Sequence, residues 1–248
     1  MTPPSAPNEI RNRHGERLAF RFVHGAPDDA AHLLVVIGHG LTSDMDRPWS
    51  EALSEALAAR GIASLRLAFS GNGRSEGEFA DSTITKEVSD LGDALDACIG
   101  WRKGYVGHSM GGAVGMLRAA ADERIDALVS LSAVTHTREF VDRMFGDLKP
   151  GEPMLGKPHC PFSPHLREDL HAYDTLAPRA ADVRVPWLMV HGDADEVVPV
   201  THSVDLVAAA GPNAELVRLP GVDHSFTGAG LSQLVDAVVP WLAAQLGS

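Results

Sequence analysis

The chain has 248 residues, of which 44% are hydrophobic and 22% charged, as is usual for a globular protein. Its 33 acidic and 21 basic residues give a formal net charge of -12, which opposes a general attraction to nucleic acid or anionic membranes. No apolar run approaches the ~18 residues of a membrane span, and the polar, proline-rich start lacks the apolar core of a secretory signal. We therefore expect a cytoplasmic protein of one domain, residues 1–248, that binds neither nucleic acid nor a membrane.

After a start that is expected to be disordered, apolar strand patterns alternate with helical patterns. The helix predicted over 84–99 has an acidic outer face that we expect to be solvated, formed by Glu87, Asp90, Asp93 and Asp96. In chain order the predicted elements are strands 18–23 and 33–37, helix 49–60, strand 62–69, helix 84–99, strand 105–106, helix 110–121, strands 128–131 and 187–190, helix 200–210, strand 215–219 and helix 231–246.

This alternation with short connections predicts an α/β fold, a mostly parallel central sheet with helices on both faces. The alternation is interrupted at about 135–183 by a proline-rich, mixed segment, which we interpret as an insertion in the domain. Ligands of such sheets bind outside the carboxyl ends of the strands. The loops that follow the predicted strands should therefore meet at one rim; they begin at Gly38, Ser70, Gly107, Gly192 and Pro220.

The strongest chemical signal is a G-x-S-x-G pattern, residues 107–111, between a predicted strand and a helix. This context is typical of a nucleophile elbow, a turn so sharp that the residues two positions before and after Ser109 must be glycine. A serine that only caps the helix would leave Gly107, Gly111 and Gly112 without explanation. We therefore predict Ser109 as a nucleophile exposed at the sheet rim.

A serine nucleophile needs a base and an acid that orients the base, in the chain order Ser, acid, His. Two later loops supply candidates at the same rim. The first follows strand 187–190 and carries Asp193 and Asp195, and the second follows strand 215–219 and carries His224. The residues alone leave either aspartate open as the acid.

Three motifs, GHSMGG, HGDADEVVP and GVDHSF, resemble the elbow, acid loop and histidine loop of the α/β-hydrolase family, and the resemblance covers nearly all of the chain outside the insertion. The resemblance implies an α/β-hydrolase fold in which Ser109 is the nucleophile, Asp195 the acid and His224 the base, with Asp193 as the alternative acid. It also implies an oxyanion hole formed by the backbone N–H groups of Met110 and Leu41. The family carries supporting histidines at positions matching His39, His108 and His191.

Other patterns are weaker. The loop 70–77 resembles a family loop but has Ser70 and Asn72 where Arg and His are usual, and its glycines match neither dinucleotide nor Walker spacing. We expect no metal, because His159, Cys160 and His165 fit no ligand pattern. The two cysteines, Cys98 and Cys160, are expected to be structural thiols.

The expected activity is hydrolysis of small carboxylic esters through an acyl-enzyme, without a cofactor. The resemblance is to small bacterial carboxylesterases, including feruloyl esterases, and to their serine aminopeptidase-like relatives. The same triad would serve a peptidase, thioesterase or acyltransferase, and the fold also occurs in non-catalytic binding proteins. In this family the 135–183 insertion would be a cap over the active site, and the residues that bind the substrate remain open.

Overall fold

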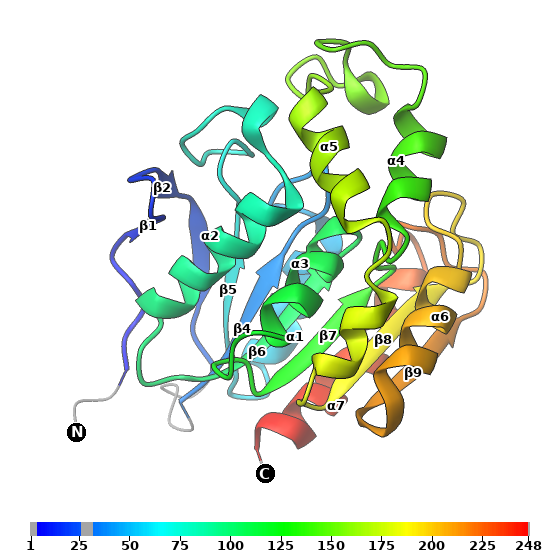
Figure 1. The fold of residues 1–248 in the computed structure, drawn as a ribbon. Helices are drawn as coiled ribbons and strands as arrows, with labels where there is room; N and C mark the ends of the chain where they lie inside the picture. Colours follow the sequence, from blue (N-terminus) through cyan, green and yellow to red (C-terminus); the bar gives the residue numbers. More distant parts are fainter. Residues whose placement is uncertain (1–3, 26–31, 248) are drawn as a thin grey trace.

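The computed structural model describes residues 4–25 and 32–247, which form a layered α/β structure with helices on both faces of a sheet (Figure 1). The strands are β1 (Ile10–Arg11), β2 (Arg17–Leu18), β3 (Phe20–Val23), β4 (Leu33–Gly38), β5 (Ala63–Leu67), β6 (Arg102–His108), β7 (Ala127–Leu131), β8 (Trp187–Gly192) and β9 (Ala214–Leu219). The helices are α1 (Pro48–Ala58), α2 (Ile84–Ala97), α3 (Met110–Ala119), α4 (Thr137–Phe145), α5 (Pro164–Tyr173), α6 (Thr201–Ala210) and α7 (Gly230–Leu246). Four short 3₁₀ turns lie between them in these two stretches, at Phe79–Asp81, Met154–Gly156, Ala177–Asp182 and Gly211–Asn213.

Within the described residues, seven strands form one sheet in the order β3-β5-β4-β6-β7-β8-β9, and β3 alone runs antiparallel to its neighbour. The predicted α/β-hydrolase architecture is confirmed. Because side chains of a strand alternate between faces, β4 supplies both cores. Leu34 and Val36 pack with α2 and α3, whereas Val35 and Ile37 pack with α1 and α7.

The first residues are more ordered than expected. Ile10–Arg11 pairs antiparallel with Arg17–Leu18, and Ile10 is fully buried in the core. The prediction of a disordered start is therefore wrong for this hairpin, and residues 1–3 lie outside the described part. The single strand expected over 18–23 is divided between β2 and β3.

The acidic face of α2 is only partly solvated, which corrects a second expectation. Asp96 is exposed, but Glu87 and Asp90 are buried. Asp90 accepts hydrogen bonds from the Ser70 backbone N–H and the Asn12 side chain, each at 2.8 Å. Burial, with smaller contributions from Asp90 and Asp169, raises the pKa of Glu87 well above its usual range and so favours the neutral carboxyl.

Strand β6 is longer than the predicted 105–106. It begins at Arg102 and includes Lys103, a residue that sequence patterns place outside a buried strand. The Lys103 ammonium donates to the carbonyls of Cys98 and Trp101, so its charge is hydrogen-bonded although the residue is buried. Strand β6 therefore runs the full length needed to carry Ser109 to the rim.

The 135–183 segment contains two helices, α4 and α5, that pack against each other at one end of the molecule (Figure 1). Phe140, Val141 and Phe145 of α4 and Leu166 and Leu170 of α5 are buried and join the core on the α2–α3 side of the sheet. No described helix is long and apolar enough to cross a membrane. Both cysteines are free and buried.

Candidate active site

Ser109 joins β6 to α3 in a backbone conformation that non-glycine residues rarely adopt, with φ 54° and ψ -117°. Such strain persists only where the surroundings enforce it. The Ser109 N–H donates to the Leu131 carbonyl at 2.8 Å. A Cβ at Gly107 would lie 2.1 Å from the Gly111 carbonyl oxygen, and one at Gly111 would lie 2.3 Å from that of His39. Glycine is therefore required on both sides of Ser109 by packing as well as by the turn.

His224 and Asp195, on the loops after β9 and β8, form a close pair. The distance from His224 Nδ1 to Asp195 Oδ2 is 2.7 Å. The other carboxylate oxygen accepts the backbone N–H groups of Val197 and Val198, and the side chain is 1% exposed. Burial alone would raise the pKa of Asp195, but hydrogen bonding to His191 and His224 outweighs burial and holds this pKa far below its usual range. Asp195 is therefore a buried, ionised carboxylate that is held against the His224 ring.

Asp193, the alternative acid, has a different place. It is exposed, and its Oδ1 accepts the Gly221 backbone N–H at 2.6 Å. Asp193 thus ties the two loops together through the backbone, and the structure places Asp195 against His224.

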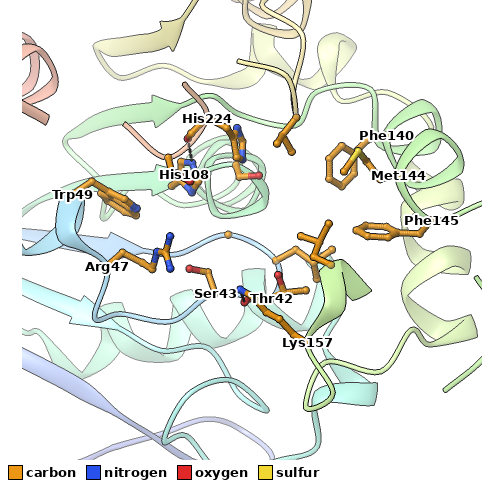
Figure 2. A pocket seen from close by; sticks show the side chains of 16 residues that line it. Thr42, Ser43, Arg47, Trp49, His108, Phe140, Met144, Phe145, Lys157 and His224 are labelled. Carbon is orange, nitrogen blue, oxygen red and sulfur yellow. Dashed lines mark hydrogen bonds between the residues drawn. The ribbon is translucent and has the colours of Figure 1, made fainter. Parts of the chain in front are cut away.

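His108 supports the His224 loop. Its Nε2–H donates to the His224 carbonyl at 2.8 Å, as the dashed line in Figure 2 shows, and the two rings lie 4.6 Å apart. Burial, with a smaller contribution from His224, lowers the pKa of His108 to about 3, so this ring stays neutral. Ser109 and His224 line the same cavity, although no hydrogen bond joins these two described side chains. Such bonds often form only when substrate binds.

The loop after β4 passes directly beside Ser109. Strands β4 and β6 are in register with Gly38 opposite Gly107, so the loops that follow them start at the same level. A Cβ at Gly40 would lie 2.9 Å from the Ser109 Cβ. Only a glycine allows the backbone to approach the serine so closely.

His39 fixes the orientation of this loop. The Gly40 carbonyl accepts hydrogen bonds from His39 Nδ1–H and from the Ser43 N–H, at 2.9 and 3.1 Å. In a trans peptide the N–H points opposite to the carbonyl, so the Leu41 N–H points away from His39. Nε2 of His39 accepts the Phe69 N–H, and burial lowers the pKa of His39 to about 4. His39 is therefore neutral and hydrogen-bonded at both ring nitrogens, and it fixes the direction of the Leu41 N–H.

Met110 is the first residue of α3, where helical N–H groups lack partners in the preceding turn. Within residues 4–25 and 32–247, neither the Met110 nor the Leu41 amide donates to another group of the chain. Both amides are thus available to an anionic oxygen beside Ser109.

A cavity of about 170 Å³ opens at Ser109 and His224 (Figure 2). One side is apolar and consists of Val197 and residues of the 135–183 segment; the other side is polar and follows the loop after β4. The lining residues are Gly40, Leu41, Thr42, Ser43, Arg47, Trp49, His108, Ser109, Phe140, Met144, Phe145, Leu155, Lys157, Val197, His224 and Ser225.

Two cationic side chains of the 135–183 segment reach carbonyls on opposite sides of the cavity. Lys157 Nζ donates to the Thr42 carbonyl at 2.7 Å, where Thr42 has a positive φ of 58°. Arg143 Nη2 donates to the Val197 carbonyl, also at 2.7 Å. The segment is therefore attached to both the loop after β4 and the loop that carries Asp195.

Arg47 and Lys157 also line the cavity, and neither could be predicted because no sequence motif contains them. The departures at Ser70 and Asn72 fall away from the cavity lining: the Asn72 amide donates to the Ser70 carbonyl and to Ser82. No group of three metal-binding side chains gathers anywhere in the described part of the chain.

The sheet, its two helical layers and the strained turn after β6 define the class of α/β-hydrolases. Residues 29–151 and 159–228 match the family model described as serine aminopeptidase, S33, and the chain belongs to this family of hydrolases. The predicted family resemblance is confirmed.

Several relatives are similar over most of the chain. An uncharacterized protein of Mycobacterium tuberculosis is 30% identical, with 87% of this chain and 71% of the relative covered. The putative carbamate hydrolase RutD of Azorhizobium caulinodans is 27% identical, with 83% and 87% covered. Among solved structures, Est1E from Butyrivibrio proteoclasticus, with ferulic acid bound, has a TM-score of 0.81 and 26% identity, with 97% and 99% covered.

Proposed function

We propose that the protein hydrolyses carboxylic esters through an acyl-enzyme formed on Ser109. His224 Nε2 takes the hydroxyl proton as the Ser109 oxygen bonds to the ester carbonyl carbon, and the N–H groups of Leu41 and Met110 receive the negative oxygen. The carbon–oxygen bond to the alcohol then breaks, and His224 gives its proton to the departing oxygen. Water, deprotonated by His224, attacks the acyl-enzyme in the same way and releases the acid.

The observation that carries this proposal is the short contact between a buried Asp195 carboxylate and a His224 ring that lines a cavity together with a strained serine. A structural role explains the strain poorly, because a serine that serves only as a helix cap needs no positive φ. Ferulic acid, named with the Est1E structure, is the acid part of carboxylic esters and is consistent with such a substrate.

We further propose that the 135–183 segment acts as a cap within a single domain and provides the acyl site. Phe140, Met144 and Phe145 reach the cavity from α4. Apolar side chains on the wall of a concave site are typical of small-molecule pockets.

The test uses p-nitrophenyl butyrate and a fluorophosphonate label. Ser109→Ala should lower kcat by about 10⁵-fold or more and abolish labelling. Ser225→Ala is the matched control, because Ser225 lines the same cavity outside the elbow, and it should keep both activity and labelling. Undiminished turnover by a folded Ser109→Ala protein would refute the assignment.

A thioester and an amide of butyrate separate the alternatives that share this mechanism. One relative, at 27% identity, is the mitochondrial palmitoyl-protein thioesterase ABHD10 of the rat, which makes a thioesterase the second candidate. A kcat/KM higher for the thioester than for an oxygen ester of equal leaving-group acidity would favour that candidate.

A further inference from the structure

The cavity at Ser109 is positively charged, although the protein carries a formal net charge of -12. Arg47 and Lys157 line the cavity, and the described lining contains no aspartate or glutamate. Charges of one sign on the wall of a low-dielectric cleft raise the local concentration of a ligand of the opposite sign. The lining therefore favours a substrate with a negative group.

Arg47 differs from its arginine neighbours in having no carboxylate partner among the described residues. Arg21, Arg66 and Arg74 all lie within 4 Å of the Asp46 carboxylate, the shortest distance being 2.6 Å. No described carboxylate lies within ion-pair distance of Arg47, which is half-buried just before α1. A partly desolvated guanidinium with up to five free donors is suited to bind a carboxylate or phosphate with two parallel hydrogen bonds.

Arg47 also lies on a defined side of the cavity. In Figure 2 Arg47 and Trp49 lie beside His108, whereas Phe140, Met144 and Phe145 lie at the opposite end, with His224 between the two groups. The Trp49 and His108 rings are 5.3 Å apart. An ester whose acyl chain occupies the apolar end therefore directs its alcohol toward Arg47, past the His224 ring that must protonate the leaving oxygen.

We propose that the preferred substrates are esters of an apolar acid with an alcohol that carries a carboxylate or phosphate, which Arg47 binds. This inference rests on the proposed esterase function and specifies its substrate class. Lys157 adds positive potential, with one of its three donors already on the Thr42 carbonyl. Asp44 opposes this potential with a negative charge, because it lines an adjoining cavity together with Arg47 and Lys157.

The experiment compares two substrates, para-butyryloxybenzoate and its neutral methyl ester. The measured quantity is the ratio of kcat/KM for the anionic substrate to that for the neutral one. We expect Arg47→Gln to lower this ratio about tenfold, and added salt to lower it in the wild type, because salt screens exposed charges. Asp44→Asn should raise the ratio.

Arg60→Gln is the matched control, because it removes the same charge from the exposed residue beyond the other end of α1. Its ratio should equal that of the wild type. An unchanged ratio in Arg47→Gln would overturn the inference while leaving the esterase proposal intact. Arg47→Gln could instead change the ratio of kcat/KM for p-nitrophenyl hydrogen succinate to that for p-nitrophenyl butyrate. That result would place the anion in the acyl part of the substrate and would also overturn the inference.

If neither ester is hydrolysed, the esterase proposal fails, and binding then decides the inference separately. We expect para-hydroxybenzoate to bind the wild type more tightly than Arg47→Gln in calorimetry, with Arg60→Gln unchanged. Equal affinity for all three proteins would refute a role of Arg47 in anion binding.

Discussion

Asp195→Asn tests the central pair of the site, because the surroundings dictate how an asparagine would sit. Two backbone N–H groups, those of Val197 and Val198, donate to Asp195 Oδ1 at 2.9 and 2.8 Å. An asparagine must therefore place its carbonyl oxygen there and turn its NH₂ group toward His224. A donor at that position requires an unprotonated Nδ1, so the proton moves to Nε2, the atom that accepts the serine proton in the proposed mechanism.

The expected loss follows from this wrong tautomer and from the missing charge. In a serine protease the equivalent change lowers kcat by about 10⁴-fold, and we expect a similar loss here with p-nitrophenyl butyrate at pH 7. Asp193→Asn, two residues away, removes a charge from an exposed side chain that accepts a hydrogen bond from the Gly221 N–H, and it should keep activity within about threefold. Activity that survives Asp195→Asn but not Asp193→Asn would refute the assignment of the acid.

Three further predictions concern stability, the acyl site and the thiols. Because burial lowers the pKa of His39 to about 4 and of His108 to about 3, the unfolded chain binds protons near pH 6.5 that the folded chain does not. The free energy of unfolding in urea should therefore fall by about 2 kcal/mol for each of these two histidines on going from pH 7 to pH 5. The fall should be smaller in His39→Gln, and a free energy of unfolding that does not change with pH would contradict this prediction. Leu155 lines the cavity, is 56% exposed and has a positive φ that asparagine tolerates, so Leu155→Asn should lower kcat/KM for p-nitrophenyl hexanoate about fivefold while the Tm stays unchanged. Burial raises the pKa of the Cys98 thiol to about 11, and Cys160 is also buried, so neither should react with Ellman's reagent until urea unfolds the protein; rapid native labelling would be inconsistent with the structure.

Elements with uniform side-chain patterns could be predicted closely from the sequence. The apolar runs 33–37 and 187–190 correspond to β4 and β8, and the helical pattern over 84–99 corresponds to α2. Elements whose stability depends on distant partners could not. Asp90 is buried because its carboxylate binds Asn12, which is 78 residues away, and Ser70, which is 20 residues away. A local helical pattern indicates neither partner.

The candidate site shows the same division. Local constraints on a sharp turn indicate Ser109, and the position of His224 after a strand indicates the proposed base. The choice between Asp193 and Asp195 depends on which side chain faces His224, and that follows from how two loops fold against each other. Arg47 and Lys157 meet at one cavity only because segments more than 100 residues apart come together, so no spacing in the sequence indicates them.

The attachments that the 135–183 segment makes through Lys157 and Arg143 end on main-chain carbonyls, those of Thr42 and Val197. Every residue type offers a carbonyl, so substitution of Thr42 or Val197 leaves the acceptor in place, whereas substitution of Lys157 or Arg143 removes the donor. Mutational scanning and comparison of side chains therefore reveal the donor of each hydrogen bond but not its acceptor. Variation in the two receiving loops can consequently reshape the cavity wall without releasing the segment above it.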